Sequence, residues 1–158
     1  MTFQGSTFWW ITGTQLLYGP AVIEEVTRHS QIMVDALNSD PAIVGRVVFH
    51  GAMTHAQDIT DTLLAANADP TCAGVIAWMH TFSPAKMWIT GLSRLQKPYL
   101  HFNTQFSRDI PWDSIDMDYM NLNQSAHGDR EHGFLTARLR LPRKVIAGHW
   151  EDLSVRRR

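Results

Sequence analysis

The chain has 158 residues, of which 44% are hydrophobic and 18% are charged, and its formal net charge is −1. These values suit one globular domain spanning residues 1–158 and exclude a disordered or strongly basic chain, so we expect no nucleic-acid partner. A single cysteine, no secretory signal and no apolar stretch near the roughly 18 residues of a membrane span predict a cytoplasmic protein without a membrane partner.

Short apolar runs alternate with segments of helical periodicity along the chain. Strands are predicted at 8–12, 46–49, 74–79, 98–102 and 144–149, and helices at 20–37, 54–67, 84–95, 113–124 and 130–139. Asp113 can cap the fourth helix, and Gly128 is expected to interrupt a helix. Residues 152–158 read as one helical turn with three solvated arginines.

This alternation of strands and helices predicts right-handed βαβ units. The expected fold is therefore α/β: a Rossmann-like or flavodoxin-like, doubly wound parallel sheet of about five strands with flanking helices. We expect the flavodoxin-like strand order 2-1-3-4-5.

Ligands of such sheets bind beyond the carboxyl ends of the strands, near the point where the strand order reverses. The first, third and fourth predicted strands lead into loops that carry neutral hydrogen-bonding groups and aromatic side chains, but no lysine or arginine. This combination suits a polyol. We therefore predict that Gln15, Tyr18, His80 and Phe82 gather in one sugar-sized hollow, and His149 is a further candidate at the end of the fifth strand.

A nucleotide site is the obvious alternative for this fold. The first turn contains Gly13 and Gly19, but it has neither a G-x-G-x-x-G motif nor a Gly-Lys-Ser/Thr motif. We therefore expect no nucleotide cofactor.

Side chains that can bind a metal or transfer a proton are most concentrated at residues 121–133, with the sequence NLNQSAHGDREHG. His127 and Glu131 are four residues apart, so on a helix they share a face and can bind a divalent metal or relay a proton. A complete metal site needs three or more ligands, so His127, Glu131 and His132 are weak metal candidates within this chain. A charge pair near a helix end and a histidine at a subunit interface are the alternative interpretations.

Three collinear segments resemble the L-arabinose isomerase family: GTQLLYG at 13–19, WMHTFSPAKMW at 78–88 and PWDSIDMDYMNLNQSAHGDREHG at 111–133, with GHW at 148–150. The resemblance implies a cytoplasmic aldose–ketose isomerase that converts L-arabinose to L-ribulose and, as a side reaction, D-galactose to D-tagatose. It also implies an ene-diol mechanism, Mn²⁺ or a similar divalent ion, and a homo-oligomer with shared pockets.

The same resemblance assigns roles to particular residues. Gln15, Leu17, Tyr18 and Phe82 would face the sugar, whereas Gln124 and His127 would reach into the pocket of a neighbouring subunit, with His127 as the catalytic candidate. Leu16 departs from relatives that carry a polar residue there. The family's metal ligands lie beyond residue 158, so the chain is read as an N-terminal domain, a natural or engineered truncation without the later metal-binding domains.

Two functions from different classes stay open. One is an isomerase or its fragment. The other is a catalytically inactive domain for sugar binding and oligomerisation. A domain removed from a larger subunit should uncover an apolar face, which predicts self-association into a ring or a larger oligomer.

Overall fold

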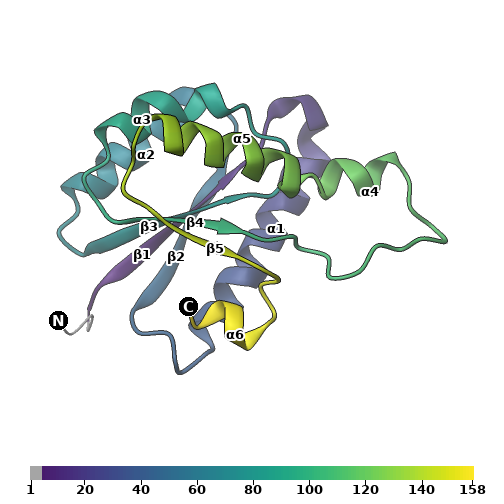
Figure 1. Ribbon diagram of the computed structural model, residues 1–158, viewed down its shortest axis with the longest axis horizontal. Coiled ribbons are helices and arrows are strands. Elements are labelled where there is room, and N and C mark those ends of the chain that lie inside the picture. The colour runs from purple at the N-terminus through teal and green to yellow at the C-terminus, as the bar shows by residue number, and fades with distance from the viewer. Residues whose placement is uncertain (1–4) are drawn as a thin grey trace.

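The computed structural model describes residues 5–158. Five parallel strands form one sheet in the order β2-β1-β3-β4-β5 (Figure 1). The strands are β1 (Thr7–Gly13), β2 (Arg46–Met53), β3 (Cys72–Met79), β4 (Tyr99–Asn103) and β5 (Lys144–Ala147). The predicted fold class and strand order are therefore confirmed.

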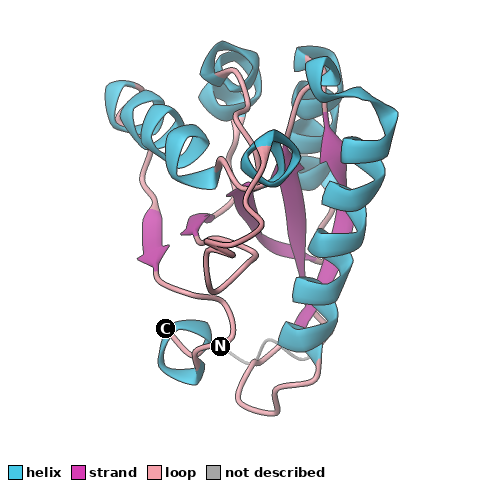
Figure 2. Cartoon of the chain, turned by 90° about the vertical axis from the view of Figure 1, so that its right-hand side faces the viewer, coloured by secondary structure: helices cyan, strands magenta, loops and turns pink. Residues whose placement is uncertain are grey.

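Helices cover both faces of the sheet, as the view along its edge shows (Figure 2). They are α1 (Gly19–Asn38), α2 (Ala56–Ala68), α3 (Ile89–Arg94), α4 (Met117–Leu122), α5 (Ser125–Arg138) and α6 (Leu153–Arg156), with 3-10 turns η1 (Leu16–Tyr18) and η2 (Ala85–Trp88). Side chains of α1 and α6 pack into the core on one face, whereas those of α2, α3 and α5 pack into the core on the other. No helix within residues 5–158 is long and apolar enough to cross a membrane.

The two cores follow from the alternation of side chains along the central strands. Trp9 and Ile11 of β1 belong to the core beneath α2, α3 and α5, whereas Trp10 belongs to the core beneath α1. In β3, Ala77 and Trp78 divide between the same two cores. A strand buried on both faces must be apolar throughout, which explains the unbroken runs in the sequence.

The segment before α4 differs from the prediction. Asp116, and not Asp113, caps this helix, because its Oδ1 accepts the main-chain N–H of Tyr119 at 2.7 Å. The helix therefore begins at Met117, later than the sequence pattern suggests. Asp113 is exposed in the loop that precedes it.

The prediction that Gly128 interrupts a helix is wrong. Helix α5 runs through this position without a break, from Ser125 to Arg138. The glycine serves close packing instead: a Cβ atom at this position would lie 2.6 Å from the main-chain oxygen of Thr81 and 3.0 Å from the Cβ of Met79. Its missing side chain lets α5 approach the end of β3.

The C-terminal arginines are not a purely solvated tail as predicted. Arg156 donates from Nη1 to the main-chain oxygen of Ala36 at 3.2 Å. Arg157 forms an ion pair with the buried carboxylate of Asp40, with 3.2 Å between Nε and Oδ2. Both contacts hold the last turn of the chain near the C-terminal end of α1.

Candidate functional site

The loops that follow β1 and β3 meet at the carboxyl edge of the sheet and form what we call the rim. The buried hydroxyls of Thr14 and Thr81 lie 2.9 Å apart and hydrogen-bond these two loops to each other. The main-chain N–H of Thr14 also donates to the oxygen of Met53 at 3.1 Å, which ties the end of β2 to the same edge. The rim is thus fixed from below by buried hydrogen bonds.

The start of α5 reaches over this rim and brings four predicted site residues into contact in pairs. The Tyr18 hydroxyl donates to Oε1 of Gln124 at 3.3 Å. The ring of Phe82 stacks on that of His127, with 4.7 Å between the ring centroids and 26° between the planes. The side chain of His127 is 57% exposed, so it keeps a free surface for a ligand or a neighbouring molecule.

The remaining residues of the first loop lie at the surface. Leu17 is 83% exposed, Leu16 is 54% exposed and Gln15 is half-buried. They belong to the short turn η1 and the residue before it. A leucine so exposed is well placed to contact the carbon face of a sugar or another subunit, and its role stays a prediction.

His80 does not lie at the rim, which corrects the position predicted for it. Its side chain is buried beneath the rim, and its Nε2 lies 2.6 Å from Nδ1 of His29, whose Nε2 in turn lies 2.9 Å from Oε1 of Glu25. A carboxylate accepts only from the protonated nitrogen of His29, so Nδ1 of His29 accepts from His80. The strand position of His80 was predicted well, but its side chain turns inward, and its part in sugar binding stays a prediction.

Burial keeps both imidazoles neutral. It lowers the pKa of His80 to about 3 and, against the attraction of Glu25, the pKa of His29 to about 4. For His80 the folded pKa lies below the unfolded one, so its contribution to stability is present above about pH 6.5 and is lost as the pH falls towards 3.

A His80→Gln substitution tests this. Between pH 7 and pH 5 the imidazole of residue 80 binds a proton in the unfolded state but stays neutral in the folded state. This difference lowers the free energy of unfolding by about 2 kcal/mol. The glutamine amide can still donate to His29 but does not titrate, so we expect the loss between these pH values to shrink by that amount. Urea unfolding at both pH values measures it, with the exposed His55→Gln as control. An unchanged pH dependence in His80→Gln would refute the assignment.

A hollow of about 580 Å³ with a mixed lining lies beside the rim, at the carboxyl ends of β4 and β5, and Ile110, Ile115 and Met120 form its apolar part. Its lining is rich in amide and hydroxyl groups, which include Asn103, Thr104, Gln105, Ser107, Tyr119, Asn123, Gln124 and Ser125. Gln124 belongs both to the hollow and to the contact with Tyr18, so the hollow adjoins the rim directly. Amides and hydroxyls can both donate to and accept from sugar hydroxyls.

The hollow offers no uncompensated cation. Its arginine, Arg108, is paired with Glu151 at 3.2 Å and with Asp152 at 2.8 Å. Two polar atoms of its lining, Oδ1 of Asn123 and Nε2 of His149, are buried without a hydrogen-bond partner among the described residues. A neutral ligand with hydroxyl groups fits this environment better than an anion does.

The predicted single hollow needs a correction. Gln15, Tyr18, His80 and Phe82 do not line it, whereas the fourth-strand loop does, through Asn103, Thr104 and Gln105. His149, predicted as a further candidate, does line the hollow. Ser107, Tyr119 and Asn123, which come from the long connection between β4 and α5, also line it and were not predicted. Their amide and hydroxyl groups were the only feature of the sequence that could have indicated a role in the site. No local sequence pattern shows which of these side chains face inward.

The metal candidates do not form a cation site within the described residues. His127 and Glu131 share a helix face as predicted, with 3.6 Å between Nε2 and Oε1. His132 lies on the buried side of α5, where its Nε2 is 2.6 Å from the Tyr99 hydroxyl. Across residues 5–158 no three histidine, cysteine or acidic side chains converge in a way that could hold a metal ion. The residues present therefore do not fit the divalent ion that the resemblance implies.

A buried polar cluster that no local sequence pattern predicts holds α5 against the sheet. Nε2 of His101 on β4 lies 2.6 Å from Oδ1 of Asp129 on α5, and both side chains are buried. Burial raises the pKa of Asp129 to about 6, while the hydrogen bond from His101 opposes the rise. Burial also lowers the pKa of the neighbouring His132. This cluster sets the position of the helix that carries Gln124 and His127.

Fold and site together define a doubly wound α/β domain with a hollow of mixed polar and apolar lining at its strand ends. Residues 2–158 match the model of the L-arabinose isomerase N-terminal domain. The chain is 58% identical over 149 residues to the L-arabinose isomerase of Thermotoga petrophila and 59% identical over 151 residues to that of Anoxybacillus flavithermus. These matches cover 94% and 96% of this chain and 30% of each relative. The chain therefore belongs to the L-arabinose isomerase N-terminal domain family, and it spans less than a third of the length of these relatives.

Proposed function

We propose that the chain acts as the sugar-recognition domain of an L-arabinose isomerase, which converts L-arabinose to L-ribulose and D-galactose to D-tagatose through an ene-diol. The observation that carries the proposal is the joining of Tyr18 to Gln124 and of Phe82 to His127 across the rim, in a chain of this family. Amide and phenol groups would bind sugar hydroxyls, and the aromatic ring would pack on sugar carbons.

His127 is the residue proposed to act on the substrate. Its imidazole is exposed and lies beside Glu131, so it can exchange a proton with a sugar hydroxyl and return to its starting state. Mn²⁺ or a similar divalent ion belongs to the proposal as a cofactor held by other residues. A cytoplasmic location and a homo-oligomer with shared pockets complete it.

The alternative is a domain that binds sugar and supports oligomerisation without catalysing the reaction. The lack of a three-ligand metal cluster within residues 5–158 favours this second function for the chain on its own. An assay of the purified 158-residue protein with L-arabinose and Mn²⁺, with and without a chelator, separates the two. Chelator-sensitive formation of L-ribulose supports an active fragment, whereas sugar binding without turnover supports the recognition domain.

A His127→Ala substitution tests the residue assignment. Loss of the imidazole removes both the contact with Phe82 and the proposed contact with the sugar, so we expect L-arabinose to bind at least about 10-fold more weakly, or about 1.4 kcal/mol. Calorimetric titration measures this, with turnover followed where it occurs. Phe134→Ala, an exposed aromatic on the same helix, is the control. Unchanged affinity and activity in His127→Ala would remove this residue from the site.

A further inference from the structure

The turn that follows β5 forms one wall of the hollow at the carboxyl ends of β4 and β5. The main-chain N–H of Gly148 donates to the main-chain oxygen of the last residue of β4 at 3.2 Å. The main-chain N–H of Trp150 donates to Oγ1 of Thr104 at 3.1 Å, and its indole N–H donates to the main-chain oxygen of Phe106 at 2.9 Å. These bonds hold His149, which lies between Gly148 and Trp150, against the loop that follows β4.

His149 carries a buried donor in this wall. The main-chain N–H of Glu151 donates to Nδ1 of His149 at 3.3 Å, so in the neutral ring this nitrogen has no hydrogen and Nε2 has one. The side chain of His149 is 12% exposed, and its Nε2 has no hydrogen-bond partner among the described residues. Buried N–H groups in proteins are nearly always paired, so this one indicates a partner from outside the chain.

Asn123, in the segment between α4 and α5, carries a matching acceptor. Its Nδ2 donates to the main-chain oxygen of Tyr119 at 2.9 Å, which sets the orientation of the amide. Its Oδ1 is buried and accepts no hydrogen bond from within residues 5–158. Because Asn123 and His149 both line the hollow, this cavity has one donor and one acceptor that the described protein groups do not satisfy.

The rest of the lining favours a small ligand that is partly apolar and has no net charge. Ile110, Ile115 and Met120 offer an apolar surface for carbon atoms. The guanidinium of Arg108 is already paired with two carboxylates and so offers no unpaired positive charge. The volume of about 580 Å³ lies within the range of about 300–1,000 Å³ that is usual for small-molecule pockets.

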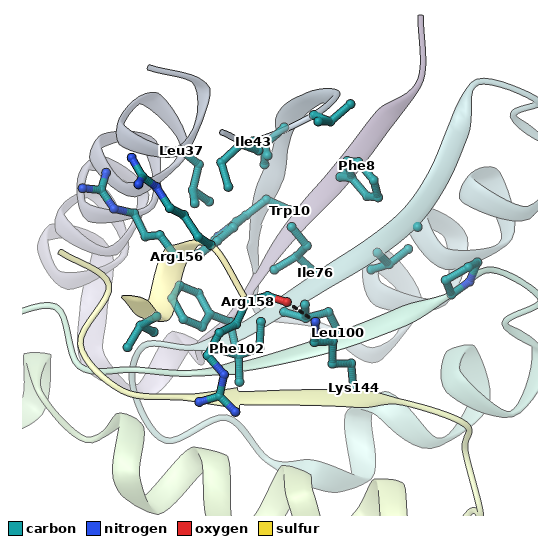
Figure 3. Close-up of a pocket in the computed structure, with 18 of the residues that line it drawn as sticks. Phe8, Trp10, Leu37, Ile43, Ile76, Leu100, Phe102, Lys144, Arg156 and Arg158 are labelled. Carbon is teal, nitrogen blue, oxygen red and sulfur yellow. Dashed lines mark hydrogen bonds between the residues drawn. The ribbon is translucent and has the colours of Figure 1, made fainter. Parts of the chain in front are cut away.

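A second cavity, of about 470 Å³ on the face of the sheet that carries α1, does not suit the same ligand (Figure 3). Its floor is apolar, with Trp10, Ile76, Leu100 and Phe102, and its charged lining residues are all basic. On such a floor the hydroxyl groups of a sugar would lose their hydrogen bonds to water without replacement. A ligand rich in hydroxyl groups therefore fits the hollow at the strand ends better.

We propose that this hollow binds a small neutral polyol, with Nε2 of His149 as the donor and Oδ1 of Asn123 as the acceptor for its hydroxyl groups. A hydroxyl group both donates and accepts, so one kind of group satisfies both atoms. Gln124 lines the hollow and also contacts Tyr18, so it connects this site to the rim. The choice of L-arabinose as the polyol rests on the proposed function, whereas the site itself does not.

Two substitutions at one position test the donor. His149→Phe keeps an aromatic ring beside Trp150 but removes Nε2, so we expect L-arabinose to bind about 5-fold more weakly. His149→Gln restores an N–H donor and should bind within about 2-fold of the unmodified protein. Calorimetric titration of the 158-residue protein measures both affinities. Since His149→Phe removes an unpaired buried donor, its midpoint of urea unfolding without sugar should equal or exceed that of the unmodified protein.

Asn123→Ala is the second variant, and it should weaken binding of L-arabinose by a similar factor of about 5. His55→Phe, at an exposed histidine outside the hollow, is the control and should bind like the unmodified protein. Unchanged affinity in His149→Phe or in Asn123→Ala would overturn the proposal, and so would equal losses in His149→Phe and His149→Gln. A lower unfolding midpoint together with weaker binding in His149→Phe would indicate a packing role and would overturn it too.

The neutral character of the ligand has its own test. L-Arabonate has a carboxylate at C1, and the hollow offers this group no unpaired cation, so it should bind at least about 5-fold more weakly than L-arabinose. Equal or tighter binding of L-arabonate would overturn the assignment to a neutral polyol.

The imidazole nitrogen resonances of the isotope-labelled protein separate this site from the proposed function. L-arabinose should shift the Nε2 resonance of His149, and the rim contacts of the proposed function should shift His127. A shift of His127 alone would support the rim and overturn the hollow. A shift of His149 by the non-aldose xylitol, but not by L-arabinose, would support the hollow and contradict the proposed function. No shift of His149 with either compound would overturn the proposal.

Discussion

An Asp129→Ala substitution is expected to lower the free energy of unfolding by about 3 kcal/mol at pH 7, the largest effect among the single changes considered. The Asp129 carboxylate accepts a hydrogen bond from Nε2 of His101 at 2.6 Å, so it connects α5 to β4. Alanine leaves this donor buried without a partner, which costs about 1–3 kcal/mol. Urea unfolding at pH 7 measures the effect.

Asp129→Asn is the matched variant, because an amide oxygen can accept the same hydrogen bond from His101. We expect it to stay within about 1 kcal/mol of the unmodified protein at pH 7. The folded pKa of Asp129, at about 6, lies above the unfolded one, so its contribution to stability is present below about pH 4 and is lost as the pH rises through 6. The protein with aspartate should therefore gain about 1 kcal/mol over the asparagine variant between pH 7 and pH 5. Equal stability of the alanine and asparagine variants would contradict this account.

A Gly128→Ala substitution should destabilise the protein by about 1–3 kcal/mol, although helix propensity alone predicts a gain of about 1 kcal/mol. The new Cβ would meet the main-chain oxygen of Thr81 at 2.6 Å, and this atom belongs to a loop that cannot easily move. Helix α5 must then shift away from β3, which displaces Gln124 and His127 from the rim. We expect weaker binding of L-arabinose together with the lower stability.

Gly133→Ala in the same helix is the control. Its Cβ would lie 3.9 Å from the nearest neighbouring atom, Cε1 of His101, which is an ordinary contact distance, so the propensity gain should appear there as added stability. Thermal and urea unfolding measure the change in stability of both variants, which should be a loss for Gly128→Ala and a gain for Gly133→Ala. A Gly128→Ala protein as stable as Gly133→Ala would show that the close packing of α5 on Thr81 is not as described.

The sheet could be predicted from the sequence because its central strands are buried on both faces. Runs such as 74–79 are apolar throughout, which is typical of strands buried on both faces. Because a helix connects each strand to the next, the strands must be parallel, and few strand orders are then possible. The rim followed from the same topology, since the loops after β1 and β3 must meet where the strand order reverses.

Other features were beyond a local sequence pattern. His101 is one polar residue in a strand, and its partner Asp129 lies 28 residues away. The same holds for His80 and His29, which are 51 residues apart and meet beneath the rim. From the sequence alone Gly128 is typical of a helix breaker, and only its contact with Thr81 explains why a glycine is needed there. In each case a contact between distant segments, and not local propensity, decides the structure.

The arrangement of α5 has a consequence for altering substrate preference. Positions 128, 129 and 132 face inward, and Gln124 and His127 lie within one turn of them on the side that meets the rim. A change at the inward positions would move both rim residues at once, so its effects on different sugars could not be separated from loss of folding. Libraries aimed at a new sugar are better restricted to 124 and 127, where the supporting turn stays intact.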